Sequence, residues 1–249
     1  MAINVMSQNV MSWEKENVGT FAQRKPLIKR AVLNNSADVV GFQEVIPFWS
    51  EYLQNELEGY ENTTVYRSED SLEGTPVYWK KETLNTLDKG CFWLSETPEV
   101  SSRGWDAKYP RTASWVLFEE KETGKKFAFI NTHLDHIGQL ARINGIKLIC
   151  KYIKNKFGES IPIVLVGDFN SKPDTETVDT ARSLLKDARD VAKITSDEET
   201  IHHFKGAKET IDYIFLSECI SCNEFKIVKE KEGESFQSDH NGLIAKIEL

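Results

Sequence analysis

Short apolar runs recur along the chain and predict β-strands. Each run has about four to six residues that are either continuously apolar or alternate between apolar and polar, as buried and half-buried strands do. The runs cover Ile3–Ser7, Asp38–Phe42, Phe127–Ile130, Ile161–Val166, Tyr213–Leu216 and Leu243–Ile247.

Apolar residues at spacings of three and four predict helices between these strands. We expect helices over Phe21–Asn34 and Gln139–Phe157, a short helix beginning at Pro47, and a weaker helix over Thr177–Asp187. The pattern from Tyr60 to Phe118 indicates hairpins and long loops. Strands that alternate with helices are typical of a layered α/β or α+β architecture.

Composition is that of a globular protein with ample material for a core. The chain has 249 residues, of which 40% are hydrophobic and 28% charged. Because no linker, repeat or low-complexity tract interrupts it, we expect one domain over residues 1–249, monomeric by default. The N-terminal stretch lacks the basic and apolar regions of a signal peptide, and no run reaches the length of a membrane span, so we expect a cytoplasmic protein.

Charge and cysteine content narrow the candidate functions. The formal net charge of −8 disfavours non-specific binding to duplex DNA, although a local basic groove stays an alternative.

Cys219 and Cys222 have the spacing of half a metal site or of a redox pair. A zinc site needs two further ligands at sensible spacing, and the sequence offers none, so we interpret both as structural thiols.

Polar residues with catalytic chemistry stand at the ends of the predicted strands. Any one of them is commonly a turn former, but their recurrence at strand ends indicates that they meet. Packed carboxylates repel one another unless a cation lies between them, and an all-oxygen cluster suits Mg²⁺ or Mn²⁺. With histidines for proton transfer, such a cluster is equipped for metal-assisted attack on a phosphate ester. The residues are Asn9, Gln43-Glu44, Asn131-Thr132-His133, Asp168-Phe169-Asn170, Asp212 and Ser238-Asp239-His240.

In their order along the chain, these motifs resemble the endonuclease/exonuclease/phosphatase superfamily, which includes DNase I and the Ccr4-type deadenylases. The resemblance spans essentially the whole chain. It implies a DNase I-like fold: a four-layer α-β-β-α sandwich of two packed mixed β-sheets flanked by helices, with the site at one end. Gly90–Pro98, Gly104–Asp106, Pro110–Trp115 and His133–His136 are similar to a largely uncharacterised bacterial and fungal branch nearer the Ccr4-like side.

Two positions depart from that branch. Gly90-Cys91 stands where Gly-Thr is expected, and Asn241-Gly242 follows the Ser-Asp-His motif where an aromatic-Pro pair is commoner. Neither change removes a catalytic residue, but both bear on how the substrate fits.

The resemblance also implies roles for individual residues. Glu44 is the expected principal Mg²⁺ ligand, with Asn9 and Asp239 beside it. Asp168 is expected to orient or deprotonate the attacking water, and Asn170 to hold that water or a phosphate oxygen. Residues i and i+2 of a strand face the same way, so we expect these two side chains to share one face.

Two histidines complete the implied catalytic set. His240 is expected to pair with Asp212, and His133 to donate to a phosphate oxygen. For each residue the alternative is a purely structural role. Weaker candidates for substrate contact are Trp105, Tyr109, Arg111, His136, Arg142 and His202.

The leading hypothesis is therefore a Mg²⁺-dependent hydrolase of phosphate esters, most simply a nuclease-like phosphodiesterase acting on short or single-stranded nucleic acid. A phosphatase of a small phosphorylated metabolite, sugar or inositol phosphate is the alternative, and it fits the acidic chain better. A sphingomyelinase is less favoured, because the sequence shows no apolar hairpin for membranes. A non-catalytic phosphate-binding module is the competing class, but such modules typically lose a member of the catalytic set, which is complete here.

Overall fold

The helices occupy the stretches where apolar residues recur at helical spacing. The structure is a computed structural model, which describes residues 2–14, 18–202 and 208–249. A capping box at Thr20 starts α1, and a proline at the first turn starts α2. The helices are α1 (Phe21–Asn34), α2 (Pro47–Glu56), α3 (Gln139–Phe157), α4 (Glu176–Arg182) and α5 (Ala188–Val191).

Two mixed six-stranded sheets form the centre of the molecule. In the first sheet the order is β13 (Ser221–Val228), β16 (Gly242–Glu248), β1 (Ile3–Asn9), β2 (Val39–Gln43), β4 (Val77–Lys80) and β3 (Tyr60–Asn62). In the second it is β5 (Leu84–Trp93), β6 (Thr112–Glu120), β7 (Lys126–His133), β8 (Ile163–Asp168), β12 (Asp212–Leu216) and β9 (Lys186–Asp187).

Most neighbouring strands in these sheets are antiparallel, but β1 pairs with β2, and β7 with β8, in parallel. Two short ribbons, β10 (Ile201–His202) with β11 (Lys208–Glu209) and β14 (Lys231–Glu232) with β15 (Ser235–Phe236), lie outside the two sheets.

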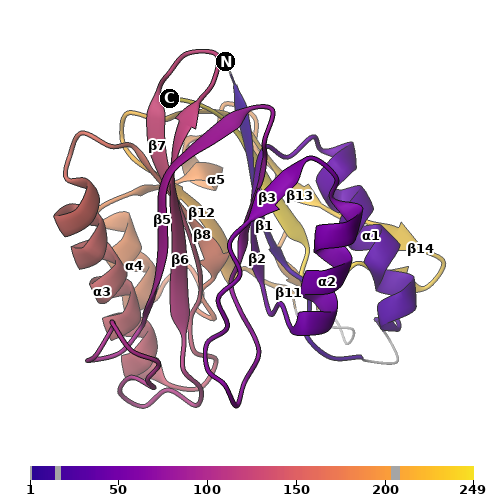
Figure 1. Cartoon of the computed structure of the whole chain (residues 1–249), viewed down its shortest axis with the longest axis horizontal. Helices are drawn as coiled ribbons and strands as arrows, with labels where there is room; N and C mark the ends of the chain where they lie inside the picture. Colours follow the sequence, from indigo (N-terminus) through magenta and orange to yellow (C-terminus); the bar gives the residue numbers. More distant parts are fainter. Residues whose placement is uncertain (1, 15–17, 203–207) are drawn as a thin grey trace.

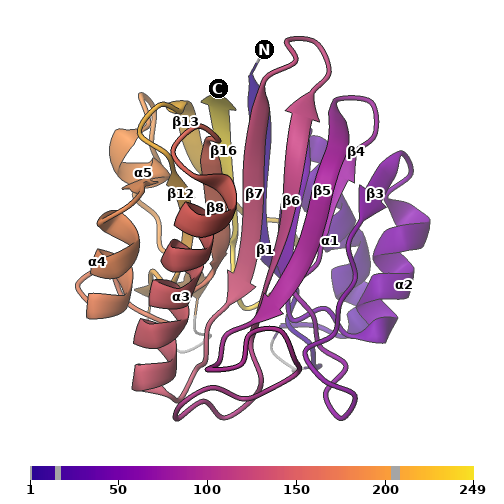
Figure 2. The ribbon, with the colours of Figure 1, turned by 60° about the vertical axis from the view of Figure 1, so that its left-hand side comes forward.

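The sheets pack face to face between two layers of helices. Figures 1 and 2 show α1 and α2 on the outer face of one sheet, and α3 and α4 on the outer face of the other. Three apolar clusters fill the three gaps between the four layers. One cluster joins the two sheets, and each of the others joins one sheet to its helices. The four-layer sandwich expected from the resemblance is confirmed.

Four of the predicted strands extend beyond or are shifted past the C-terminal ends of their apolar runs. The second predicted strand ends at Gln43, and the first and third continue to Asn9 and His133, so these polar residues are the last residues of paired strands. The run predicted from Ile161 begins at Ile163 and continues to Asp168. Strand pairing therefore fixes the backbone of several site residues, which a turn would hold less firmly.

One predicted helix is wrong at its C-terminal end. The segment predicted over Thr177–Asp187 is helical only to Arg182. Beyond it, Lys186 and Asp187 pair with β12, and Asp187 then caps α5 by accepting a hydrogen bond from the Arg189 N–H. Pairing with the sheet edge outweighs the helical spacing of the apolar residues here.

The Tyr60–Phe118 segment, predicted as hairpins and long loops, contains both. Its longest regular part is the antiparallel pair of β5 and β6, which is interrupted by a register shift between Thr86 and Asp88. A long connection joins these strands and passes the site end of the sandwich. The alternation was too irregular to place these strand boundaries from the sequence.

Gly41 lets the two sheets approach closely beneath the site. A Cβ at this position would lie 2.6 Å from Val166 Cγ2 and 2.7 Å from Asn131 Cγ, across the gap between the sheets. The Asn131 amide donates to the backbone oxygens of Phe42 and Pro76, at 2.7 and 3.0 Å. A buried polar bridge therefore replaces apolar packing at this point.

We predict that Gly41→Ala lowers the free energy of unfolding by about 1–3 kcal/mol, because the added methyl group overpacks a closed gap. Urea unfolding monitored by circular dichroism measures the change. Gly145→Ala in α3 is the matched control, because its Cβ would lie 3.4 Å from Leu94 Cδ1 and alanine favours a helix by up to about 1 kcal/mol. Equal effects of the two substitutions would contradict the close approach at Gly41.

Candidate active site

The site forms where strand ends from both sheets meet, at the end of the sandwich away from the chain termini (Figure 1). Asn9 ends β1 in one sheet, while His133 and Asp168 end the parallel strands β7 and β8 in the other. Asp212 begins the antiparallel strand β12 and stands directly opposite Asp168 in the ladder. Topology alone thus brings four of the predicted residues to one place.

Asp168 lies at the centre of this group. Its Oδ2 accepts a hydrogen bond from the Asn9 amide at 3.1 Å, and it lies 3.5 Å from His133 Nε2 and 3.7 Å from His240 Nε2. Burial and the neighbouring Asp212 carboxylate raise the pKa of Asp168 to about 7. A carboxylate with a pKa near neutrality is suited to act as a general base.

A turn places Asn170 at the site, and not the strand alternation that its spacing from Asp168 predicted. It lies beyond the end of β8 with a positive φ of 48°, so strand alternation does not set its direction. Its backbone N–H donates to Asp168 Oδ1 at 2.8 Å, and its side-chain amide donates to the Leu134 oxygen at 3.0 Å. A turn closed by the aspartate therefore holds the two side chains together.

His240 and Asp212 form a buried pair. Nδ1 of His240 lies 2.9 Å from Asp212 Oδ2 and 3.1 Å from Oδ1. Burial lowers the pKa of His240, but the carboxylates of Asp212 and Asp168 outweigh it and raise that pKa well above the ordinary value. The ring is therefore a cation oriented by Asp212.

His133 has the opposite electrostatic setting. Burial and the nearby Arg111 guanidinium hold the pKa of its ring well below the ordinary value, so the imidazole is neutral. Its Nδ1 is buried without a hydrogen-bond partner among the described residues and lies 3.7 Å from Glu73 Oε1. Two histidines beside one aspartate thus differ in charge.

The donor set beside Asp168 fits a hard divalent cation. Glu44 Oε1 accepts from the Asn9 amide at 3.1 Å, and Glu44 Oε2 accepts from the backbone and hydroxyl of Ser12, both at 2.9 Å. Glu44 and the half-buried Asp239 face the same pocket as Asp168. The Glu44 charge also raises the pKa of Asp168, a repulsion that a cation would relieve.

A second grouping of possible ligands suits a metal less well. Ligand atoms of Asp168, Asp212 and His240 lie within 4.8 Å of one another. However, His240 Nδ1 already contacts Asp212 Oδ2 at 2.9 Å, and the raised pKa of the ring favours the protonated form, which has no lone pair to offer a metal. We therefore interpret this grouping as a charge pair beside the base.

The active-site pocket has a volume of about 390 Å³. It brings together catalytic, metal-binding and substrate-contact candidates from both halves of the chain. Its lining consists of Trp13, Glu44, Arg67, Glu73, Tyr109, Arg111, His133, His136, Asp168, Asn170, Ile201, Ile211, Asp239 and His240.

Three of the weaker substrate-contact candidates form one wall of this pocket. Arg111 donates to Asp135 Oδ2 at 3.2 Å, and its other nitrogen lies 2.9 Å from His136 Nδ1. The Tyr109 ring stacks on His136 with a centroid separation of 5.9 Å, and the Arg67 guanidinium lies 4.6 Å from the Tyr109 centroid. These contacts present cationic and aromatic surface to a ligand.

Two of the other weaker candidates, Arg142 and Trp105, do not line the pocket. Arg142 donates to the Asp135 backbone oxygen at 2.9 Å, so its guanidinium is engaged in shaping the start of α3. Trp105 has a positive φ of 48° in its loop, and its backbone N–H donates to Glu96 Oε2 at 3.4 Å. His202 forms β10 with Ile201, but its side chain lies outside the described part of the structure.

Sequence reasoning missed Arg67, Glu73 and the pocket position of Trp13. Buried Arg67 and half-buried Glu73 form an ion pair at 2.6 Å, inside the segment predicted only as hairpins and loops. Nothing in the strand pattern marked them. Trp13 follows Asn9 by four residues, and that proximity was the one available signal.

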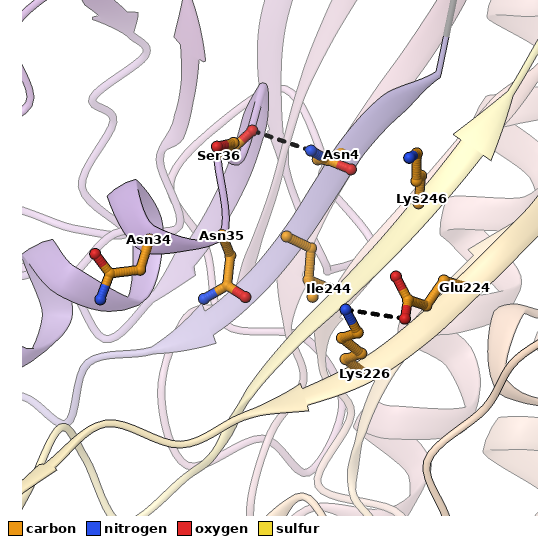
Figure 3. A pocket seen from close by; sticks show the side chains of 8 residues that line it. All are labelled: Asn4, Asn34, Asn35, Ser36, Glu224, Lys226, Ile244 and Lys246. Atoms are coloured by element: carbon orange, nitrogen blue, oxygen red, sulfur yellow. Dashed lines mark hydrogen bonds and ion pairs between the residues drawn. The ribbon is translucent and has the colours of Figure 1, made fainter.

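A second polar cavity does not compete with this site. A cavity of about 250 Å³ lies between the end of α1 and strands β1, β13 and β16, and Figure 3 shows the side chains that line it. It lies at Asn4, near the start of β1, whereas Asn9 ends that strand. Lys226 pairs with Glu224 at 2.9 Å, and Asn4 donates to the Ser36 backbone oxygen at 3.2 Å, so polar groups here satisfy one another.

The cysteines form no pair. Cys219 is exposed, and Cys222 is buried in β13, where its thiol lies 3.5 Å from the Glu224 oxygen. All four cysteines are free thiols. Among the described residues, no helix combines the length and apolar character that crossing a membrane requires.

The buried Asp168 carboxylate, the His240–Asp212 pair and the oxygen donors around Glu44 lie together at the ends of two packed sheets, an arrangement suited to hydrolysis of a phosphate ester. Comparison with known families agrees. Residues 17–240 match the model of the Endonuclease/Exonuclease/phosphatase family, and the chain belongs to this family, whose members hydrolyse phosphoric esters. The resemblance in the sequence motifs and the expectation of an enzyme of this kind are confirmed.

Solved structures show the same architecture over the full chain. An endonuclease/exonuclease/phosphatase from Bacteroides vulgatus is 31% identical, with a TM-score of 0.93 over 100% of this chain and 99% of that one. A mannosyl-6-phosphatase of Bacteroides thetaiotaomicron is 28% identical, with a TM-score of 0.87 over 99% and 100% of the two chains.

Similarity to curated proteins is more partial. Carbon catabolite repressor protein 4 homolog 3 of Arabidopsis thaliana is 25% identical over 186 residues, which are 70% of this chain and 40% of that protein. The chain spans less than half the length of the curated relatives it matches. The Ccr4-like side of the family is thus represented among them.

We predict that Asp135→Asn lowers the free energy of unfolding by about 1.5–3 kcal/mol at neutral pH, because buried charge-assisted hydrogen bonds are lost. Asp135 Oδ1 accepts from the N–H groups of Ile137 and Gly138 at 3.0 and 2.8 Å, and Oδ2 accepts from Arg111. Burial opposes the charge, but these hydrogen bonds and Arg111 hold the pKa of Asp135 well below its ordinary value.

The pH dependence of this effect follows from the lowered pKa. A carboxyl whose folded-state pKa is depressed contributes stability above its unfolded pKa of about 4, and that contribution is lost as the pH falls further. Urea unfolding at several pH values should therefore show the difference between wild type and variant shrinking from pH 5 to pH 3. Asp106→Asn is the control. Asp106 is exposed and accepts from the Ala141 N–H at 2.7 Å, so its substitution should lower the free energy of unfolding by less.

Proposed function

We propose that the protein is a Mg²⁺- or Mn²⁺-dependent hydrolase of small phosphate esters. The observation that carries this proposal is the convergence of Asp168, His240 and Glu44 on one pocket of about 390 Å³. A volume near the lower end of the usual range for ligand pockets suits one compact molecule. The net charge of −8 also favours a small ester over a nucleic-acid strand.

In this proposal Glu44 holds the cation, with Asn9 and Asp239 beside it. The cation, when bound, supplies Lewis-acid stabilisation of the charge that develops on the phosphate oxygens. Asn9 also donates to Asp168 Oδ2 and to Glu44 Oε1, so the base and the metal ligand keep a fixed separation. This bridge supports a cation and an attacking water held in register.

The remaining residues handle the water and the phosphate. Asp168 takes the proton of the attacking water, and Asn170, held by the Leu134 oxygen, faces the same water. His240 presents a positive charge that Asp212 orients, and it donates a hydrogen bond to a phosphate oxygen. His133, which is neutral, donates to a second phosphate oxygen from Nε2.

A nuclease-like phosphodiesterase is the second candidate. The specific observations in its favour are the similarity to the Arabidopsis thaliana protein named above and the aromatic side chains of Trp13 and Tyr109 at the pocket, since aromatic rings can stack on bases. The two candidates share the chemistry of attack by water and differ in the organic groups attached to phosphorus.

We predict metal-dependent hydrolysis of p-nitrophenyl phosphate, with slower turnover of bis-p-nitrophenyl phosphate and none in EDTA. Asp168→Asn should lower the rate by about 100-fold or more, because it removes the general base. Release of nitrophenolate measures both rates. A clear preference for the diester would favour the nuclease-like candidate instead.

We also predict that Mg²⁺ or Mn²⁺ raises the unfolding temperature of the wild type, because a ligand that binds only the folded state stabilises it. Glu44→Gln should abolish this rise by removing the principal ligand charge. Glu51→Gln makes the same change at an exposed position of α2 and should keep the rise. A rise that persists in Glu44→Gln would place the cation elsewhere.

A further inference from the structure

Trp13 is a large apolar side chain that stands at the active-site pocket with 52% of its surface exposed. Aromatic side chains bury much of their surface in most proteins, and an exposed one beside a polar pocket offers an unused contact face. It lines the pocket together with Glu44, Asp168 and His240. The indole is therefore close to where the phosphate is attacked.

The backbone beneath this exposed ring is held firmly. The guanidinium of Arg24, which is fully buried in α1, donates to the backbone oxygens of Val10, Met11 and Trp13 at 2.7, 3.2 and 2.8 Å. The Trp49 indole also donates to the Met11 oxygen at 3.2 Å. A buried cation with several carbonyl partners makes a rigid clamp, so the loop is preorganised before any ligand binds.

The same loop is tied to the residues proposed to hold the metal. Ser12 donates twice to Glu44 Oε2, and the Met11 N–H donates to Asn9 Oδ1 at 2.9 Å. Trp13 directly follows Ser12 in the sequence. The Trp13 Cα therefore lies at a fixed distance from Glu44. This placement suits an indole that contacts the organic group attached to the phosphate.

We propose that Trp13 is the specificity-determining residue for the organic part of the substrate, and that this part is a sugar ring that places its apolar C–H face on the indole. Arg24 is the positioning residue that holds the ring in place. The proposal deepens the proposed function and rests on it. Tyr109, 36% exposed in the same lining, bounds the pocket as well, and the volume of about 390 Å³ accommodates one sugar ring with its phosphate.

The test compares hexose phosphates with glycerol 3-phosphate, which carries the same phosphate on a chain without a ring. With Mg²⁺ present, Trp13→Ala should lower kcat/KM for the best hexose phosphate by about tenfold, mainly through KM, because the stacking contact is lost. The kcat/KM for glycerol 3-phosphate should change by no more than about twofold. Trp13→Phe keeps a ring and should retain most of the preference.

Phe48→Ala is the control for removing an exposed aromatic side chain. Phe48 lies on α2 with 40% of its surface exposed and does not line the pocket. Its substitution should leave the ratio between the two substrates unchanged. Equal losses on both substrates in Trp13→Ala would show a structural role and overturn the proposal.

A double-variant cycle tests the part assigned to Arg24. Arg24→Lys keeps the charge but cannot reach all three carbonyl oxygens, so it should weaken the preference for the hexose phosphate in the wild-type background. In the Trp13→Ala background it should have no further effect on that preference, since it acts through the indole. Additive losses would contradict a positioning role.

Binding separates a failure of this proposal from a failure of the proposed function. The Asp168→Asn variant with a hexose phosphate should show a change in tryptophan fluorescence that is absent when Trp13→Phe is added. If the wild type hydrolyses no ester but this change is present, the proposed function fails and the ring contact stands. If neither the substrate preference nor the fluorescence change occurs, or if nucleoside monophosphates alone produce them, the sugar assignment is overturned.

Discussion

The hydrogen bond from the Asn9 amide to Asp168 joins the two sheets of the sandwich, and the site depends on it. Asn9 ends a strand of one sheet and Asp168 ends a strand of the other, at 3.1 Å. The same amide donates to Glu44. Asp168, the proposed base, ends a strand of one sheet, and Glu44, the proposed metal ligand, directly follows a strand of the other. They keep one spacing only while the sheets stay in register, so fold stability is coupled to the geometry of the proposed catalytic site.

That register is set below the site by buried polar contacts. Because Gly41 has no side chain, the opposite sheet packs closely against it. Asn131 spans the gap between the sheets: its amide donates to backbone oxygens, and its Oδ1 accepts from the Gln43 amide at 2.7 Å. Apolar packing tolerates small slides between sheets, whereas hydrogen bonds have short range and fixed direction. The two predicted motif residues Gln43 and Asn131 are therefore interpreted as alignment devices and not as groups that contact the phosphate.

Much of the fold followed from the sequence because the apolar periodicity is regular where the sheets are central. The bounds of α1 and α3 match their predicted ranges. The apolar periodicity did not predict the structure where tertiary contacts determine it. The residues of β9 pair with β12 although the surrounding apolar residues have helical spacing. The pairing of β5 with β6 contains a register shift. Local sequence does not encode which edge will accept a strand.

The same distinction explains which site residues were foreseen. Asn9, His133, Asp168 and Asp212 belong to strand ends, and motif order along the chain was enough to indicate that they converge. Arg67, Glu73 and Trp13 belong to loops, and their convergence depends on how those loops fold back. The clamp at Arg24 illustrates the point: a helix residue whose charge looks suited to solvent is fully buried because three carbonyl oxygens of the Trp13 loop turn toward it. The proposed selection of substrate thus depends on loop contacts outside the shared catalytic motifs, a place where proteins with one set of catalytic residues can differ.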